Sequence, residues 1–412
     1  MTGTLVVGAG QAGVALAVAL RSTGYAAPVT LVGGEPQPPY QRPPLSKGFL
    51  DGTSAEASLA LRTPAFYAER DITLHTGEHV VAADARAGTA VTDLGTRLRF
   101  DRLALTVGAR ARRLAAPGAE LDGVLYLRDL ADARQLRERL HTARDVVVVG
   151  GGFIGLEAAA VARRRGLAVT VVEAADRLLA RSVAPATSTF YRDAHLARGT
   201  DVRLGAAVAA VHGSAGRVAA VELSDGTRLR ADLVLVGIGA QPRTELAEAL
   251  GLRCADGIVV DECARTSDPD VVAAGDCTSC PDPTGGPGRV RLESVPHALA
   301  HAAVAAATIV GDARPYTALP WFWSDQYALK LQIAGLGRGA DAHLVRGDPA
   351  TGGFSVLAVR DGRVRAVEAV NRPADPIAVR TALTRGIALP AGRAADPAVP
   401  LKELLTVSPS SV

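Results

Sequence analysis

Two glycine-rich turns, each set between an apolar strand and an apolar helix, constrain the fold more than any other feature of this sequence. The first, GAGQAG, follows TLVV, and the second, GGGFIG, follows DVVVV. In such turns glycine permits a tight turn, a close approach of the backbone to a pyrophosphate, and close packing of helix on strand. The residues of these turns that are predicted to bind a cofactor are Gly8, Gly10, Ala12 and Gly13 in the first turn and Gly150, Gly152, Ile154 and Gly155 in the second.

Each turn is followed, after its helix, by another apolar strand that ends in an acid. These strands, VTLVGGE and AVTVVE, end in Glu35 and Glu173, about 20 residues beyond the glycines, where a ribose-binding carboxylate belongs. Gly166 is expected to end the second helix. One such unit is weak evidence, because a βα turn can use these glycines without a ligand. Two complete units predict one site for FAD and one for a nicotinamide dinucleotide.

A third motif supports the FAD site. In VVAAGDC a short apolar strand leads into Gly275 and Asp276. An acid at the carboxyl end of a strand suits a hydrogen bond to a ribityl hydroxyl. Taken alone, the motif could equally be a common strand–loop junction.

Composition excludes several classes of protein. The net charge of +3 over 412 residues is far from that of a nucleic-acid-binding protein. The longest apolar stretches are too short to cross a bilayer, and the start of the chain lacks the features of a signal peptide. We therefore expect neither a nucleic acid nor a membrane as partner.

The four cysteines suggest reduced thiols and a cytoplasmic location. Cys277 and Cys280 form a CTSC pair, but a zinc site needs two such pairs, and the other cysteines lack the spacing. We expect this pair to be structural or incidental, and no metal to be bound. The first dinucleotide unit contains no cysteine, which argues against a redox-active disulfide.

A longer set of motifs, taken in order, resembles the FAD-dependent, NADH-using reductases that supply 2Fe–2S ferredoxins, the putidaredoxin reductase-like family. The resemblance runs through nearly the whole chain. It implies FAD and NADH as cofactors, a 2Fe–2S ferredoxin as partner and, indirectly, a terminal oxygenase. The motifs that carry it are GAGQAG, YQRPPLSKG, LALTVGAR, YLRDLADA, VVVGGGFIGLEAA, VGIGAQP, VVAAGDC, ESVPHALAHA and PWFWSDQYALKLQIAG.

The resemblance gives Arg42 and Lys47 a place at the flavin. Arg42 matches an FAD-contacting arginine, and Lys47 matches the lysine beside the isoalloxazine, where an ammonium stabilises the negative charge of reduced flavin. Pro43 and Pro44 stiffen the turn that carries this lysine. Glu157 matches an acid near the nicotinamide that can pair with it. The alternative for Lys47 is a solvated surface side chain.

Further positions are matched one by one. Thr106 and Gly108 correspond to the crossing from the FAD domain to the NAD domain, and Gly239 to the return. Trp323 corresponds to an aromatic residue near the flavin on the side that faces ferredoxin; its alternative is a place in the core of the C-terminal domain. The other FAD contacts that the resemblance implies are Val80, Arg128, Asp276 and Val295.

The chain departs from the family's pattern in two places. Many members have aspartate directly before the first ribose-binding acid, whereas here Gly34 precedes Glu35, so ribose recognition rests on one carboxylate. The family's asparagine and glutamine near the ES motif are replaced by His297 and His301. These histidines could act as neutral donors near the flavin or lie on the surface of a helix.

Glu173 predicts a preference for NADH over NADPH. Its carboxylate can accept hydrogen bonds from both ribose hydroxyls and would repel a 2′-phosphate. The run after it offers Arg177 rather than an immediate basic pair.

Together these features predict an α/β fold with two Rossmann-like dinucleotide-binding domains, as in glutathione reductase, plus a C-terminal α+β domain. Hairpin turns are expected at Asp225-Gly226 and Asp361-Gly362, and a helix near residues 375–386. The expected domains are FAD-binding, 1–112 and 243–318; NAD-binding, 113–242; and C-terminal, 319–412.

The function predicted on this basis is an NADH-dependent ferredoxin reductase, a monomer or weak dimer, with Lys47, Glu157 and Trp323 as its catalytic residues. Two alternatives stay open. The same scaffold could reduce another acceptor, namely rubredoxin, oxygen or a thiol, or it could serve as a non-enzymatic NAD(H) sensor.

Overall fold

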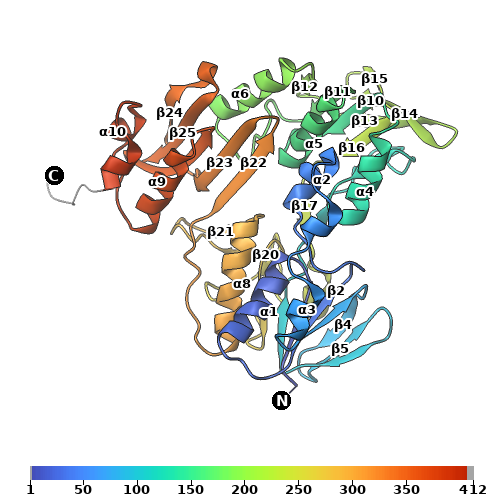
Figure 1. The fold of residues 1–412 in the computed structure, drawn as a ribbon, viewed down its shortest axis with the longest axis vertical. Helices are drawn as coiled ribbons and strands as arrows, with labels where there is room; N and C mark the ends of the chain where they lie inside the picture. The colour runs from blue at the N-terminus through green and yellow to red at the C-terminus, as the bar shows by residue number, and fades with distance from the viewer. Residues whose placement is uncertain (1, 406–412) are drawn as a thin grey trace. The chain divides into compact units, whose positions relative to one another are not determined.

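The computed structural model describes residues 2–405, which fold into two compact units (Figure 1). The first unit comprises the chain up to Gln41, together with Glu56–Arg110 and Gln241–Trp321. The second comprises Arg42–Ala55, Ala111–Ala240 and the chain from Phe322 onward. Each unit contains one of the two glycine-rich turns.

The first unit is built on a parallel sheet with the strand order β19-β7-β1-β2-β3. Its strands are short, apolar and mostly buried, as is usual for a parallel sheet that is covered on both faces. Because all five strands run the same way, their carboxyl ends lie along one edge. Their bounds are β1 Thr4–Val7, β2 Val29–Gly33, β3 Ile72–Thr76, β7 Arg102–Leu105 and β19 Val271–Ala273.

Two helices, α1 (Gln11–Ser22) and α8 (Val295–Ile309), pack side by side in this unit (Figure 1). The buried face of α8 consists largely of alanine, which lets the two helices approach closely. The other elements of the unit are η2 Glu56–Leu59, α3 Pro64–Ala68, α7 Glu245–Ala249, the antiparallel strands β4 Val80–Asp84, β5 Thr89–Thr92 and β6 Arg97–Arg99, and the short strands β18 Ile258–Val259, β20 Thr278–Pro281 and β21 Arg289–Val290.

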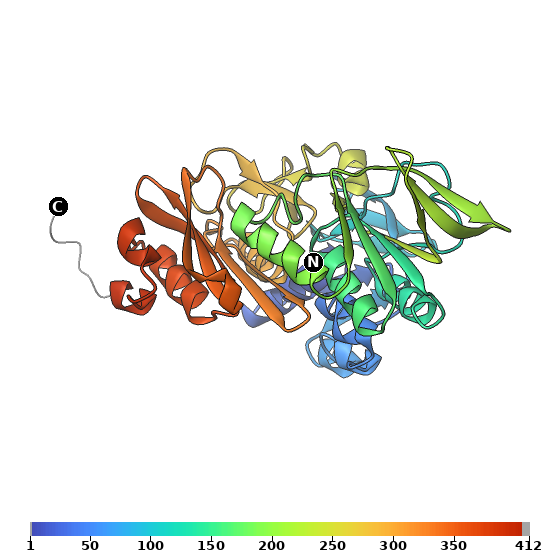
Figure 2. The same cartoon turned by 90° about the horizontal axis from the view of Figure 1, so that it is seen from above.

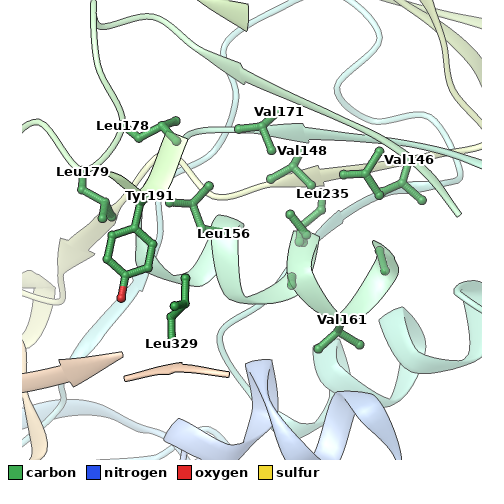
Figure 3. Close-up of a cluster of buried hydrophobic side chains, with 14 of the residues drawn as sticks. Val146, Val148, Leu156, Val161, Val171, Leu178, Leu179, Tyr191, Leu235 and Leu329 are labelled. Atoms are coloured by element: carbon green, nitrogen blue, oxygen red, sulfur yellow. The ribbon is translucent and has the colours of Figure 1, made fainter. Parts of the chain in front are cut away.

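The second unit repeats this plan with a parallel sheet of order β12-β11-β10-β16-β9. Leu156 of α5 and Tyr191 of α6 belong to its hydrophobic cluster, together with Val148 and Val171 of the sheet (Figure 3). The bounds are β9 Val124–Tyr126, β10 Asp145–Val149, β11 Ala168–Glu173, β12 Asp201–Leu204, β16 Leu233–Val236, α4 Leu130–Arg139, α5 Phe153–Arg164 and α6 Pro185–Leu196. Gly166 adopts a φ of +83° just after α5, as expected of a residue that ends a helix.

A segment from the first third of the chain packs in this second unit. It forms η1 (Pro43–Ser46) and α2 (Gly48–Asp51), which lie against α4 and α5. Phe49 and Leu50 are buried there, and Arg165 of the α5 terminus donates to the carbonyl of Leu50. The segment that carries Lys47 is therefore fixed on the helix that carries Glu157.

The C-terminal part of the second unit is a sheet of order β22-β23-β26-β25-β24 with α9 along one face (Figure 2). The predicted turn at Asp361-Gly362 is present, with φ values of +53° and +68°, and the predicted helix is α9. The antiparallel pair around Asp225-Gly226 is also confirmed. The bounds are β13 Val208–Ser214, β14 Arg217–Leu223, β15 Arg228–Arg230, β22 Trp321–Gln326, β23 Leu329–Gly335, β24 Ala342–Asp348, β25 Gly353–Arg360, β26 Arg363–Val370, η3 Pro349–Thr351, α9 Ala374–Thr384, α10 Ala391–Ala395 and η4 Leu401–Leu405.

The strands β8 (Ala109–Ala111) and β17 (Ala240–Pro242) lie where the chain changes unit. In residues 2–405 no helix combines the length and apolarity needed to cross a membrane.

Candidate functional site

The glycines that begin and end each turn are required by the protein's own backbone. Gly8 and Gly150 have φ near +109° and +107°, and a Cβ on them would lie 2.3 and 2.5 Å from the carbonyl oxygens of Thr106 and Gly237. A Cβ on Gly13 would lie 1.9 Å from the oxygen of Gly8. These contacts hold strand and helix together, so they would be needed with or without a ligand.

Packing within the protein does not require the middle glycine of either turn. A Cβ on Gly10 would meet no atom of residues 2–405 within 4 Å, and one on Gly152 would meet only the oxygen of Gly237, at 3.9 Å. Neither α1 nor α5 has a side-chain N-cap within this part of the chain. Open space beside uncapped backbone N–H groups fits the pyrophosphate of a dinucleotide, which these groups bind at a helix N-terminus.

The residues expected at FAD in the first unit gather at the carboxyl edge of its sheet. Gly8 follows β1, Glu35 follows β2, Thr106 follows β7 and Asp276 follows β19. The Thr106 hydroxyl donates to the Gly8 carbonyl at 2.8 Å and so supports the turn. Of the remaining expected contacts, Val80 begins β4 and Val295 begins α8.

Glu35 has a neighbour that the sequence did not suggest. The Tyr40 hydroxyl donates to the Glu35 carboxylate at 2.5 Å and fixes its orientation. The space that a side chain at position 34 would fill is taken by His79, because a Cβ on Gly34 would lie 2.1 Å from His79 Nε2. His79 Nδ1 lies 3.3 Å from the Asp93 carboxylate. An imidazole therefore stands next to Glu35, where many family members carry an aspartate.

His297 and His301 are not surface residues. Both are buried, with 2% and 0% of their surface exposed, and their rings lie 4.9 Å apart. His297 Nδ1 is 2.8 Å from the Tyr316 hydroxyl, and the backbone N–H of Gly275 points to His301 Nδ1 at 3.4 Å. Burial lowers the pKa of His297 to about 4 and the pKa of His301 well below its usual value. The two rings are thus neutral core residues behind the Gly275-Asp276 corner.

The CTSC pair holds two buried free thiols. The Cys277 thiol donates to the carbonyls of Ala274 and Leu105 at 3.4 and 3.6 Å. Burial raises the pKa of Cys277 to about 12 and that of Cys280 to about 11, so neither is a thiolate at neutral pH. The prediction of a structural pair agrees with this geometry.

In the second unit, Lys47 and Glu157 form the expected ion pair. Lys47 Nζ lies 2.9 Å from Glu157 Oε2, with 19% of the lysine side chain exposed and the carboxylate buried. The Ser46 hydroxyl donates to the same oxygen, and the Ser324 hydroxyl donates to Oε1 at 2.6 Å. Three donors on one buried carboxylate suit its charged form, because a buried charge needs such compensation. The reading of Lys47 as a fully solvated side chain is wrong.

Arg42 and Arg128 also lie together in this unit. The Arg42 guanidinium donates to the carbonyl of Arg128 at 2.7 Å, and the backbone N–H of Arg128 donates to Asp132. Arg128 follows β9 at the carboxyl edge of the second sheet. Two cations that the resemblance assigns to FAD are therefore neighbours.

Glu173 binds the second glycine turn directly. Its carboxylate accepts from the backbone N–H of Gly151 at 2.6 Å and from that of Ala175 at 2.8 Å. Arg177 donates to the carbonyls of Ala180 and Val183, so its guanidinium holds the loop that follows β11. The guanidinium of Arg181 lies beside Gly239, because a Cβ added at Gly239 would be 3.0 Å from Arg181 Nη2.

Trp323 and Ser324 occupy opposite faces of β22, because side chains alternate along a strand. Ser324 donates to Glu157, and Trp323 is half-buried, with the Phe322 ring 6.5 Å away. No motif in the sequence points to Ser324. The chain turns that cross between units are held by Gly108, which accepts from Arg243, and Gly239, which accepts from Arg112.

Comparison with known proteins extends this description to the whole chain. Residues 2–302 match the family described as pyridine nucleotide-disulphide oxidoreductase, and residues 321–405 match the family described as reductase C-terminal. A rhodocoxin reductase from Rhodococcus erythropolis is 45% identical over 97% of this chain and 93% of its own length. A putidaredoxin reductase from Pseudomonas putida is 41% identical over 98% and 97%. The solved covalent putidaredoxin reductase–putidaredoxin complex matches with a TM-score of 0.95 and 40% identity, covering 98% of both chains.

Proposed function

The chain belongs to the pyridine nucleotide-disulphide oxidoreductase family, and on that premise we propose that it is an NADH:ferredoxin reductase. It passes electrons from NADH through FAD to a 2Fe–2S ferredoxin, which serves a monooxygenase or dioxygenase. The observation that carries the proposal is the similarity to putidaredoxin reductase along the whole chain, C-terminal domain included. In the solved complex, that reductase is joined covalently to putidaredoxin.

Residues of the first unit would hold FAD. The open side of Gly10 and the N-terminus of α1 accept the pyrophosphate, and Glu35, oriented by Tyr40, accepts from the adenosine ribose. Asp276 stands at the end of β19, where it can bond a ribityl hydroxyl. When bound, FAD supplies the hydride acceptor and the means of releasing electrons one at a time.

Residues of the second unit would hold NADH. Gly152 and the N-terminus of α5 offer the same open backbone, and Glu173 lies at the turn to accept from the ribose hydroxyls. A carboxylate already bound to two N–H groups is fixed in place. Its negative charge supports the expected preference for NADH over NADPH.

On the family resemblance, we propose that the Lys47–Glu157 pair of the second unit serves the reaction of NADH with FAD. The ammonium at Lys47 would stabilise negative charge on bound flavin. Glu157, anchored by Ser46 and Ser324, holds the Lys47 ammonium at a defined place. A preorganised charge of this kind costs no reorganisation during the reaction.

Electron transfer through thiols is not supported. Cys277 and Cys280 are buried, reduced and far from the thiolate state at neutral pH. We therefore propose that electrons pass from the flavin to the acceptor without a thiol intermediate. We further propose a cytoplasmic location, a monomer or weak dimer, and the three-domain division given above.

The proposal is tested by offering the purified FAD-containing protein four acceptors under NADH: a 2Fe–2S ferredoxin, a rubredoxin, a disulfide and oxygen. The ferredoxin should give a kcat/KM at least about tenfold above the others. Rubredoxin or oxygen as the preferred acceptor would replace ferredoxin in the proposal, and absence of turnover with all four would favour a sensor.

A further inference from the structure

We propose that His195 is a positioning residue for the Lys47–Glu157 pair, acting through Gln326 and Ser324. The proposal rests on the proposed function in one respect: Lys47 and Glu157 are taken to serve the reaction of NADH with FAD. The chain of contacts itself is independent of that assignment and lies within the second unit.

Four buried polar side chains form a continuous line. His195 lies on α6 and has 0% of its surface exposed, as have Gln326 and Ser324 of β22, while Glu157 of α5 has 2%. His195 Nε2 is 3.0 Å from Gln326 Oε1, Gln326 Nε2 is 3.3 Å from Ser324 Oγ, and Ser324 Oγ is 2.6 Å from Glu157 Oε1. Buried polar groups of this kind are costly unless all are satisfied, so their arrangement is tightly specified.

The donor and acceptor of each hydrogen bond in this line can be assigned by starting from the Glu157 carboxylate. An ionised Glu157 only accepts, so the Ser324 hydroxyl must donate to it, which leaves Ser324 Oγ to accept from the Gln326 amide nitrogen. Gln326 then presents its oxygen to the histidine, so His195 must carry its proton on Nε2. The Tyr327 hydroxyl, 3.5 Å from His195 Nδ1, stands where it can donate to the unprotonated nitrogen.

This line holds Glu157 in place and does not conduct protons. An amide cannot pass a proton from its oxygen to its nitrogen without becoming an imidic acid, so Gln326 interrupts any relay. Burial lowers the pKa of His195, which keeps the ring neutral and able to hold the Nε2–H tautomer. His195 thus fixes the Gln326 amide, the amide fixes the Ser324 hydroxyl, and the hydroxyl fixes Glu157 Oε1 while Oε2 faces Lys47.

In this proposal His195 and Ser324 act through each other. Loss of either should free Glu157 to turn, loosen Lys47 and weaken the stabilisation of charge on the flavin. Residues that act through one another show non-additive effects in a double-mutant cycle, whereas independent residues add.

The test uses the FAD-containing protein and three readouts. The variants are His195→Leu, Ser324→Ala and both together, with His195→Gln as the rescue, because a glutamine amide can still donate to Gln326. The matched control is Tyr191→Phe, one turn earlier on α6, whose buried hydroxyl has no hydrogen-bond partner within residues 2–405. The readouts are the ¹⁵N NMR tautomer of His195, the flavin midpoint potential and the rate of flavin reduction by NADH.

The expected wild-type result is a neutral His195 with its proton on Nε2. His195→Leu and Ser324→Ala should each lower the flavin potential and slow flavin reduction about five- to tenfold. The double variant should be no slower than the slower of the two single variants. His195→Gln should recover most of the wild-type rate. Tyr191→Phe should match the wild type.

An Nδ1–H tautomer, or additive effects with an unchanged potential, would overturn the proposal. If His195→Leu does not fold, Ser324→Ala and the wild-type tautomer decide the matter alone. These readouts need no electron acceptor, so failure to reduce any ferredoxin would sink the proposed function and leave this inference standing.

Discussion

Lys47 is one of three lysines in the chain, and a turn with two prolines holds it against a buried carboxylate. We predict that Lys47→Met slows the reduction of bound FAD by NADH about ten- to hundredfold, because one charge-assisted interaction is worth about 1.5–3 kcal/mol. The flavin potential should fall, whereas FAD occupancy should change little. The measurement is anaerobic stopped-flow absorbance of the flavin together with its absorbance ratio to protein.

Lys330→Met is the matched control, since Lys330 is an exposed lysine on β23 of the same unit. It should leave the reduction rate within about twofold. Equal rates for wild type and Lys47→Met would return Lys47 to a purely structural place beside Glu157.

The Glu173 carboxylate has two proposed roles: it accepts hydrogen bonds from the backbone of the second glycine-rich turn, and it binds the ribose of NADH. Glu173→Gln keeps an acceptor for one backbone N–H and removes the charge. We expect the ratio of kcat/KM for NADH to that for NADPH to drop about tenfold, with the melting temperature nearly unchanged. A wild-type protein that already prefers NADPH would contradict this account of Glu173.

In each glycine-rich turn, the first and last glycines are needed for packing, whereas the middle glycine is expected to serve ligand binding. Gly10→Ala adds a methyl group where the protein has space, so the apoprotein should keep its free energy of unfolding within about 0.5 kcal/mol while FAD binds about tenfold or more weakly. Gly13→Ala places a methyl group 1.9 Å from a carbonyl oxygen and should destabilise the apoprotein by about 1–3 kcal/mol or more.

Urea unfolding of both apoproteins and FAD titration by fluorescence quenching check this pair. Unchanged FAD affinity in Gly10→Ala would mean that the pyrophosphate does not lie against this turn.

The helix α8 makes the first unit sensitive to acid. A histidine whose pKa falls from 6.5 to about 4 on folding binds its proton more readily in the unfolded chain. The contribution of His297 to stability is therefore fully present above pH 6.5, falls as the pH drops toward 4, and below that pH is smaller by about 3 kcal/mol. His301, whose pKa shifts in the same direction, adds to the effect.

We predict that the double variant His297→Asn and His301→Gln flattens the loss of stability between pH 6.5 and 4. Thermal unfolding across that range is the measurement, with the exposed His343→Gln as control. A slope equal to that of the wild type would show that these rings are protonated without cost.

The regular elements could be predicted from sequence because their signals are local. The strand–glycine–helix units and the Asp361-Gly362 turn depend on residues a few positions apart. His79 beside Gly34 could not be predicted, since it comes from the loop between β3 and β4, 45 residues later in the chain. The same holds for Ser324, which meets Glu157 from 167 residues away.

At the scale of the whole molecule, the second unit draws its reactive groups from four separate parts of the sequence. Residues 42–55, α5, α6 and β22 meet around Glu157, and only the pairing of Lys47 with Glu157 was anticipated, through the family resemblance. The absence of cysteine from the first dinucleotide-binding segment predicts that no redox disulfide acts there, and burial of Cys277 and Cys280, which raises the pKa of both thiols, agrees with a structural role for the CTSC pair.

Replacing both thiols at once is the whole-molecule prediction. Cys277→Ser with Cys280→Ser should leave NADH-driven electron transfer within about twofold, provided FAD stays bound, because no sulfur lies in the proposed path. A collapse of activity at full FAD occupancy would bring the thiol mechanism back.

Electron flow from NADH through FAD to a 2Fe–2S protein can be followed by double-mixing stopped flow. The protein is first reduced with one equivalent of NADH, then mixed with an oxidised 2Fe–2S ferredoxin, and the flavin and iron–sulfur absorbances are followed together. We predict fast flavin reduction by NADH, followed by flavin reoxidation that matches the reduction of two ferredoxins per NADH. Flavin that stays reduced while the ferredoxin stays oxidised would contradict this prediction.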